Sequence, residues 1–154
     1  MPTFIKKSEI PASAEDVFRW HTRPQALNDL TPPWEPAELA HRTGGIEDIG
    51  SQVTLKVGHK PFRITWLAEH TACEPGRSFV DVQRKGPFAK WIHTHSMIPK
   101  DQNSCWLEDR IEYALPLAPL SEWLAGWYVR RKLERMFQYR HQVTREALQR
   151  KADL

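Results

Sequence analysis

The chain has 154 residues, of which 40% are hydrophobic and 27% are charged, and 22 Lys and Arg against 19 Asp and Glu give a net charge of +3. This length predicts a single domain over residues 1–154 with room for a substantial core. The charge excess is too small to indicate nucleic-acid binding, and the motifs of DNA- and RNA-binding domains are missing, so we expect no nucleic-acid partner.

The chain begins MPTFIKK, which lacks the apolar run of a signal peptide, and no later segment has the apolar length of a transmembrane helix. Cys73 and Cys105 lie far apart and show neither a CxxC spacing nor the density of a disulfide-rich protein. We therefore expect a cytoplasmic protein with reduced thiols.

The first forty residues predict one strand and two short helices. Residues 4–10 mix β-forming and charged side chains and stop at Pro11, which indicates a first strand. Ser13 and Asp16 resemble a capping box at the start of a short helix. A second short helix is expected from Pro24 through Leu30, because the consecutive prolines at 32 and 33 cannot continue it.

Between residues 38 and 115 the apolar side chains recur with a period of two, which predicts an antiparallel meander of five or six strands. The segments 51–57, 61–71, 79–83, 88–98 and 105–115 are the clearest strands, separated by turn-forming residues. The expected inward-facing residues in three of them are Val53, Leu55 and Val57; Phe62, Ile64, Trp66 and Ala68; and Leu107, Ile111, Tyr113 and Leu115.

Residues from about 121 to 150 predict one long C-terminal helix, roughly 45 Å in length. An apolar stripe at helical spacing runs along it, made of Val129, Leu133, Met136, Val143 and Ala147. This stripe needs an apolar partner, and the inner face of the sheet is the only one large enough. The fold class is therefore α+β, with a curved antiparallel sheet wrapped on the long helix.

This order of elements resembles the START and polyketide-cyclase superfamily, also called SRPBCC, and the resemblance spans nearly the whole chain. Its most distinctive motifs are Phe79 to Gln83, Gly86-Pro87-Phe88, Trp91, His93, His95, Asp109, Tyr113, Pro116, Met136-Phe137 and Tyr139-Arg140, which look like a bacterial ligand-binding SRPBCC subgroup. The resemblance implies the helix-grip (START-like) fold. It does not select one function, because the superfamily includes lipid carriers, receptors and aromatase/cyclases.

Strand alternation gathers polar residues on the inner face of the predicted sheet. Trp91, His93 and His95 share one face of their strand, and Asp81, Asp109 and Tyr113 are expected to face the same way. Arg140 lies within the helix stripe and is expected to pair with Asp81 or Asp109, because a buried cation needs a carboxylate. The predicted ligand-binding residues are Trp66, Asp81, Trp91, His93, His95, Asp109, Tyr113, Met136 and Arg140.

The leading hypothesis is a binding or carrier domain for a small hydrophobic, lipid- or polyketide-like ligand in an internal cavity. One alternative is a cyclase or dehydratase in which His93, His95 and Asp109 supply acid–base chemistry with Tyr113 as proton donor. Another is a purely structural network of the same residues. His-x-His with an Asp is a weak metal signal, so we predict no metal and no cofactor.

The start of the long helix carries Trp123, Trp127 and Tyr128. We expect these side chains to cover the mouth of the cavity. The alternative is an apolar patch, with Leu117 and Leu120, that forms a weak homodimer or contacts a lipid surface. The basic run at 130–132 is interpreted as a solvated helix face, and the alternative is that it binds an anionic partner or a membrane surface.

Overall fold

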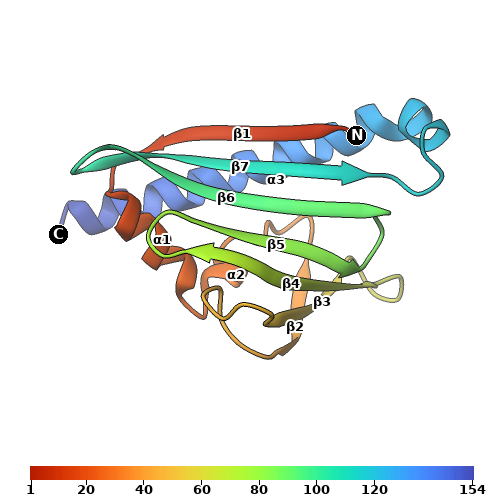
Figure 1. Ribbon diagram of the computed structural model, residues 1–154, viewed down its shortest axis with the longest axis horizontal. Helices are drawn as coiled ribbons and strands as arrows, with labels where there is room; N and C mark the ends of the chain where they lie inside the picture. The colour runs from red at the N-terminus through yellow and green to blue at the C-terminus, as the bar shows by residue number, and fades with distance from the viewer.

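The computed structural model describes residues 1–154 as a seven-stranded antiparallel sheet and three helices (Figure 1). The strand order across the sheet is β1-β7-β6-β5-β4-β3-β2. This is the predicted helix-grip arrangement. The strands are β1 (Thr3–Ile10), β2 (Ala37–Arg42), β3 (Gln52–Val57), β4 (Ile64–Glu74), β5 (Ser78–Lys85), β6 (Lys90–Asp101) and β7 (Ser104–Ala114); the helices are α1 (Ala14–Thr22), α2 (Ala26–Asp29) and α3 (Leu120–Ala152).

Helix α1 begins where the sequence predicts, because the backbone N–H of Asp16 donates a hydrogen bond to Ser13 Oγ over 3.1 Å. Helix α2 is only one turn long and ends before the prolines that follow it. Both short helices lie between β1 and β2 in the chain, and α1 packs against β6 and β7. Helix α1 covers the part of the sheet that the C-terminal end of α3 also approaches (Figure 1).

Helix α3 lies across the sheet and packs mainly along β1 and β7 (Figure 1). Its buried side chains follow steps of four and three residues and are Leu133, Phe137, His141, Thr144 and Leu148. The predicted stripe contains Leu133, but its other members are half-buried on the flanks of this face. The predicted stripe therefore lies beside the buried face of α3, because the prediction left out the polar side chains at the centre of that face.

The apolar core under α3 is divided into two clusters. One lies near α1 and contains Phe18, Phe79, Met97 and Leu148. The other lies under the middle of α3 and contains Phe4, Trp91, Ile111, Leu133 and Phe137. The polar residues described below lie between these two clusters.

Two sequence predictions about large apolar side chains are wrong. Phe62 is 86% exposed, because β4 begins at Ile64 and Phe62 lies in the preceding turn. Trp123, Trp127 and Tyr128 are also exposed and cover no cavity mouth, because the first turns of α3 extend past the sheet. None of the three helices combines the length and the apolar character needed to cross a bilayer.

Candidate functional site

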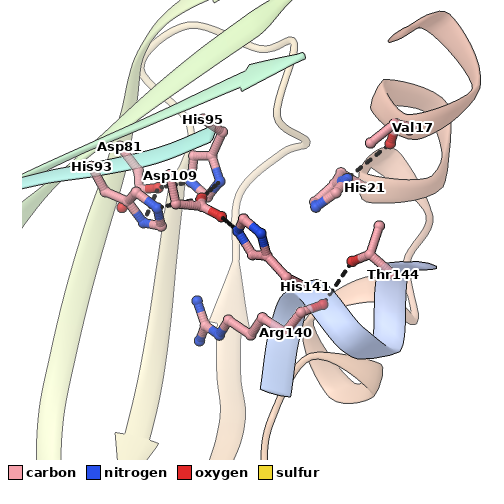
Figure 2. Close-up of polar contacts among 9 residues, drawn as sticks. All are labelled: Val17, His21, Asp81, His93, His95, Asp109, Arg140, His141 and Thr144. Atoms are coloured by element: carbon pink, nitrogen blue, oxygen red, sulfur yellow. Dashed lines mark hydrogen bonds and ion pairs between the residues drawn. The ribbon is translucent and has the colours of Figure 1, made fainter. Parts of the chain in front are cut away.

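A layer of ionisable side chains (Figure 2) lies between the two apolar clusters. Asp81 on β5, His93 and His95 on β6 and Asp109 on β7 all project from the inner face of the sheet, as strand alternation predicts. The strand register places Asp81 opposite His93 and His95 opposite Asp109. The structure therefore brings together four of the predicted site residues.

Asp109 is the centre of this layer and accepts hydrogen bonds from three histidines. His93 Nε2 donates to Asp109 Oδ1 over 2.7 Å, and His95 Nδ1 contacts the same oxygen at 3.0 Å. His141 Nε2, from α3, donates to Oδ2 over 2.6 Å. Burial favours a neutral acid, but the hydrogen bonds from His141, His93 and His95 outweigh it and hold the pKa of Asp109 well below its usual value.

His95 lies between two carboxylates and carries a positive charge at neutral pH. Its Nε2 donates to Asp81 Oδ2 over 2.8 Å, while its Nδ1 contacts Asp109. Burial opposes the charge, but the hydrogen bonds to Asp109 and Asp81 raise the pKa of His95 to about 9. The ring stacks on Phe79 with the centroids 3.9 Å apart, which further favours a cation.

The neighbouring groups have complementary charge states. Burial raises the pKa of Asp81, but the hydrogen bond from His95 and the charges of His93 and His95 lower it below its usual value overall. Burial and the adjacent charge of His95 lower the pKa of His93. The layer thus holds two carboxylates, one imidazolium and one neutral imidazole on the sheet.

Sequence reasoning missed the histidines that reach this layer from the helices. His141 Nδ1 lies 2.8 Å from Ser8 Oγ, so His141 bridges α3, β1 and Asp109. His21, at the end of α1, donates from Nδ1 to the carbonyl oxygen of Val17 over 2.8 Å. The spacing of His141 between Phe137 and Thr144 was the available signal, because it continues the buried face of α3.

His21 differs from His95 in its charge at neutral pH. Burial lowers the pKa of His21 to about 4, so the ring is neutral. Since Nδ1 donates to Val17, Nε2 is the free acceptor, and it forms no hydrogen bond with the protein. The His21 and His95 ring centroids are 6.5 Å apart.

A cavity of about 10 Å³ lies at the centre of the layer. Its lining residues include three of the predicted ones and several that the sequence did not indicate: His21, Leu30, His95, Leu107, Asp109, Phe137, Arg140, His141 and Thr144. This volume holds roughly one water molecule. A cavity therefore lies where the sequence predicts one, but its volume is much smaller than that of a lipid or polyketide.

Arg140 lines this cavity without the carboxylate partner that the sequence predicts (Figure 2). Its guanidinium forms no ion pair, and its buried Nε has no hydrogen-bond partner. The group lies 5.1 Å from the ring centroid of Phe137. Burial lowers the pKa of Arg140, and the charges of Asp109 and Asp81 act in the opposite direction. The expected pairing fails because histidines occupy both oxygens of Asp109 and one oxygen of Asp81.

The predicted apolar site residues belong to the second apolar cluster or pack against it. Trp91 and Tyr113 are buried in it, and Trp66 and Met136 pack on its edge. Trp66 lies opposite Leu55 in the β3–β4 pair, and both side chains are only half-buried. The inner face of β3 and β4 therefore offers incompletely covered apolar surface beside the polar layer.

Asp81, His93 and His95 also form a candidate metal group, since one ligand atom from each lies within 4.8 Å of the others. Metal ligation requires a deprotonated imidazole, whereas the pKa of about 9 keeps the proton on His95 at neutral pH. Both nitrogens of that ring are already bound to carboxylates. A metal ion would therefore have to displace that proton and break at least one of these contacts to bind here.

Comparison with known proteins agrees with the fold. Residues 10–138 match the family described as polyketide cyclase / dehydrase and lipid transport. A START superfamily protein from Mycobacterium smegmatis is 15% identical with a TM-score of 0.67, and the alignment covers 96% of this chain and 97% of that one. Norcoclaurine synthase from Thalictrum flavum, solved with dopamine and hydroxybenzaldehyde, is 15% identical with a TM-score of 0.71, covering 96% and 87%.

A third similar structure contains this fold as one part of a longer protein. The nucleoside-diphosphate sugar epimerase from Corynebacterium glutamicum is 25% identical with a TM-score of 0.68, and the alignment covers 95% of this chain but 29% of that one. No curated protein matches the sequence significantly. The solved structures therefore establish the architecture, and the site must be interpreted from its own geometry.

Proposed function

As its motifs predict, the chain belongs to the polyketide cyclase / dehydrase and lipid transport family, a family of ligand-binding domains, and we propose that it binds a small, mainly apolar molecule through an acidic head group. The head group contacts Arg140. The apolar body lies against the inner face of β3 and β4.

The observation that carries this proposal is the unpaired guanidinium of Arg140. Arg140 is half-buried, but its Nε is fully buried, and buried donors in proteins almost always have partners. Arg140 Nε has none, although two carboxylates are close enough to influence its pKa. A carboxylate or enolate of a ligand would fit this position, because guanidinium binds planar oxyanions with two parallel hydrogen bonds.

Half-buried apolar side chains on the inner face of the sheet suit the body of such a ligand. Leu55, Val57 and Trp66 project from the inner face of β3 and β4 and remain partly exposed. Because the cavity is only about 10 Å³, a molecule larger than water enters by displacing α3 or the segment around Leu30. Binding is thus expected to follow a local opening of the helix layer.

The test is to purify the protein from cells and analyse it by native mass spectrometry and by solvent extraction. We expect an equimolar acidic, apolar molecule on the natural protein and its loss from Arg140→Met. Arg150→Met is the matched control, because Arg150 is exposed on the same helix. A protein that carries nothing and is not thermally stabilised by panels of fatty acids and polyketide acids would reject the proposal.

Acid–base catalysis is the second candidate, because the layer contains two imidazoles of opposite protonation state. His95, with a pKa of about 9, and His21, with a pKa of about 4, line the same cavity. Groups whose pKa values are driven apart in this way are suited to the roles of acid and base. His21 Nε2 would accept a proton from a bound carbon acid, while the positive charge of His95, whose N–H groups are bound to carboxylates, would stabilise the developing oxyanion without a hydrogen bond.

This candidate is tested with a synthetic β-keto thioester, whose conversion to a cyclised or dehydrated product is followed by liquid chromatography and mass spectrometry. We expect His21→Gln to abolish turnover and leave ligand retention intact. Retained turnover in that variant would reject His21 as the base. Absence of turnover in the natural protein, with a ligand still bound, would leave the binding function alone.

A further inference from the structure

One end of the molecule carries a large exposed apolar surface. We define the tryptophan patch as Leu117, Leu120, Trp123, Leu124, Trp127 and Tyr128. Trp123 is 80% exposed and Trp127 is 68% exposed. Isolated exposed apolar residues are ordinary, but a continuous group of six that includes three aromatic rings indicates an interaction surface.

The position of the patch follows from helix geometry. Leu120, Leu124 and Trp127 recur at steps of four and three, so they lie along one face of the first turns of α3. These turns extend past the start of β1, at the end of the sheet where the N-terminus lies (Figure 1). The first fully buried side chain of α3 is Leu133. The patch therefore has no partner within the chain.

The same end of the sheet is rich in positive charge. Arg130 and Arg131 follow the patch directly, and Arg131 forms no ion pair. The antiparallel order brings the β3–β4 turn, the end of β5 and the start of β6 to this end, which adds Lys60, Lys85 and Lys90. The β3–β4 turn also carries the exposed Phe62. Glu122 is the only acidic residue between Leu117 and Tyr128.

We propose that this end of the protein docks on the surface of an anionic phospholipid bilayer, with the tryptophan patch inserted at the headgroup level. Trp and Tyr are the side chains that favour the membrane interface, and Lys and Arg beside them bind anionic headgroups. A symmetric dimer through the same patch is disfavoured, because it would bring the basic clusters of two copies together. This inference does not depend on the proposed function of the polar layer.

The test is flotation of the full chain with vesicles of phosphatidylcholine alone and of phosphatidylcholine with phosphatidylserine. We expect binding to the anionic vesicles that weakens with salt. The double variant Trp123→Ala with Trp127→Ala should bind at least about tenfold more weakly, since two large apolar side chains no longer insert. Arg131→Glu should bind roughly fivefold or more weakly.

Matched controls lie at the opposite end of the molecule. Ile49→Ala removes an exposed apolar side chain from the β2–β3 loop, and Arg150→Glu reverses a charge near the end of α3. Both should bind as the natural protein does. Equal binding to neutral vesicles, or binding that the patch variants leave unchanged, would overturn the proposal. So would a dimer in solution, measured by sedimentation, that the double tryptophan variant dissociates.

Discussion

The two apolar clusters and the polar layer between them are built on different physical principles. The clusters around Phe18 and Phe137 are close-packed side chains that stabilise the fold by burying apolar surface. The layer around Asp109 buries ions, which offers little net stability because desolvation offsets the attraction between charges. A domain of this kind could be held together by apolar residues alone, so the ionic layer indicates a function.

Removal of the central carboxylate should have the largest effect on stability. Asp109→Ala leaves the imidazolium of His95 and the N–H groups of His93 and His141 without their shared acceptor. We expect the free energy of unfolding to fall by about 4 kcal/mol in urea denaturation. Asp153→Ala, at the exposed end of α3, is the control. A loss below about 1 kcal/mol would mean that the layer is hydrated rather than closed.

Truncation of the apolar cluster near α1 should also destabilise the protein, but the loss of stability should not depend on pH. Leu148→Ala leaves a cavity beside Phe18 and Phe79 and should lower the free energy of unfolding by about 3 kcal/mol. Because no ionisable group is lost, this deficit should stay constant from pH 5 to pH 9. A deficit that changes across this range would show that the cluster and the layer are coupled.

His95 should make stability decrease as the pH rises. The pKa of His95 is about 9 in the folded protein and about 6.5 when unfolded, so its contribution is complete below pH 6.5 and is lost as the pH rises through 9. We expect a loss of about 2–3 kcal/mol across this window. His95→Gln should start less stable and lack this slope. A natural protein with a flat stability profile between pH 6.5 and 9 would contradict the charged state of His95.

Arg140 should matter least for stability. Arg140→Met removes a half-buried cation whose buried Nε has no hydrogen-bond partner, and the loss of its attraction to Asp81 and Asp109 offsets the gain. We expect a change within about 1 kcal/mol. Arg145→Met is the comparison, because Arg145 donates two hydrogen bonds to the carbonyl oxygen of Glu9 and should lose about 1 kcal/mol. A loss above about 3 kcal/mol at Arg140 would identify it as a structural ion-pair partner.

Strand periodicity and turn residues were sufficient to predict the fold and the inward direction of Asp81, His93, His95 and Asp109. Their pairing could not be predicted, because hydrogen bonds between strands depend on register and side-chain rotamers. His21 and His141 were missed for a related reason. Each lies on a helix, where a single polar residue in an apolar stripe does not reveal which strand it meets.

The side chains at the start of α3 show a feature that the sequence pattern predicted wrongly. Trp123, Trp127 and Tyr128 were expected to cover the cavity mouth, because the long helix was expected to cross the rim of the cavity there. They are exposed because α3 is longer than the sheet surface it covers, a property of the relative placement of elements rather than of any local pattern. The volume of the cavity could not be predicted from the sequence either, because it depends on how the side chains of the sheet and of the helices interdigitate.

The most direct test of the proposed function follows the Arg140 Nε–H signal by nuclear magnetic resonance during titration with decanoate and, separately, with decanol. We predict that decanoate shifts this signal in a saturable manner and that decanol, which has the same chain without the charge, does not. The indole N–H signals of Trp123 and Trp127 report binding at the patch instead. An Arg140 signal that stays in place while decanoate shifts only these indoles would contradict the account.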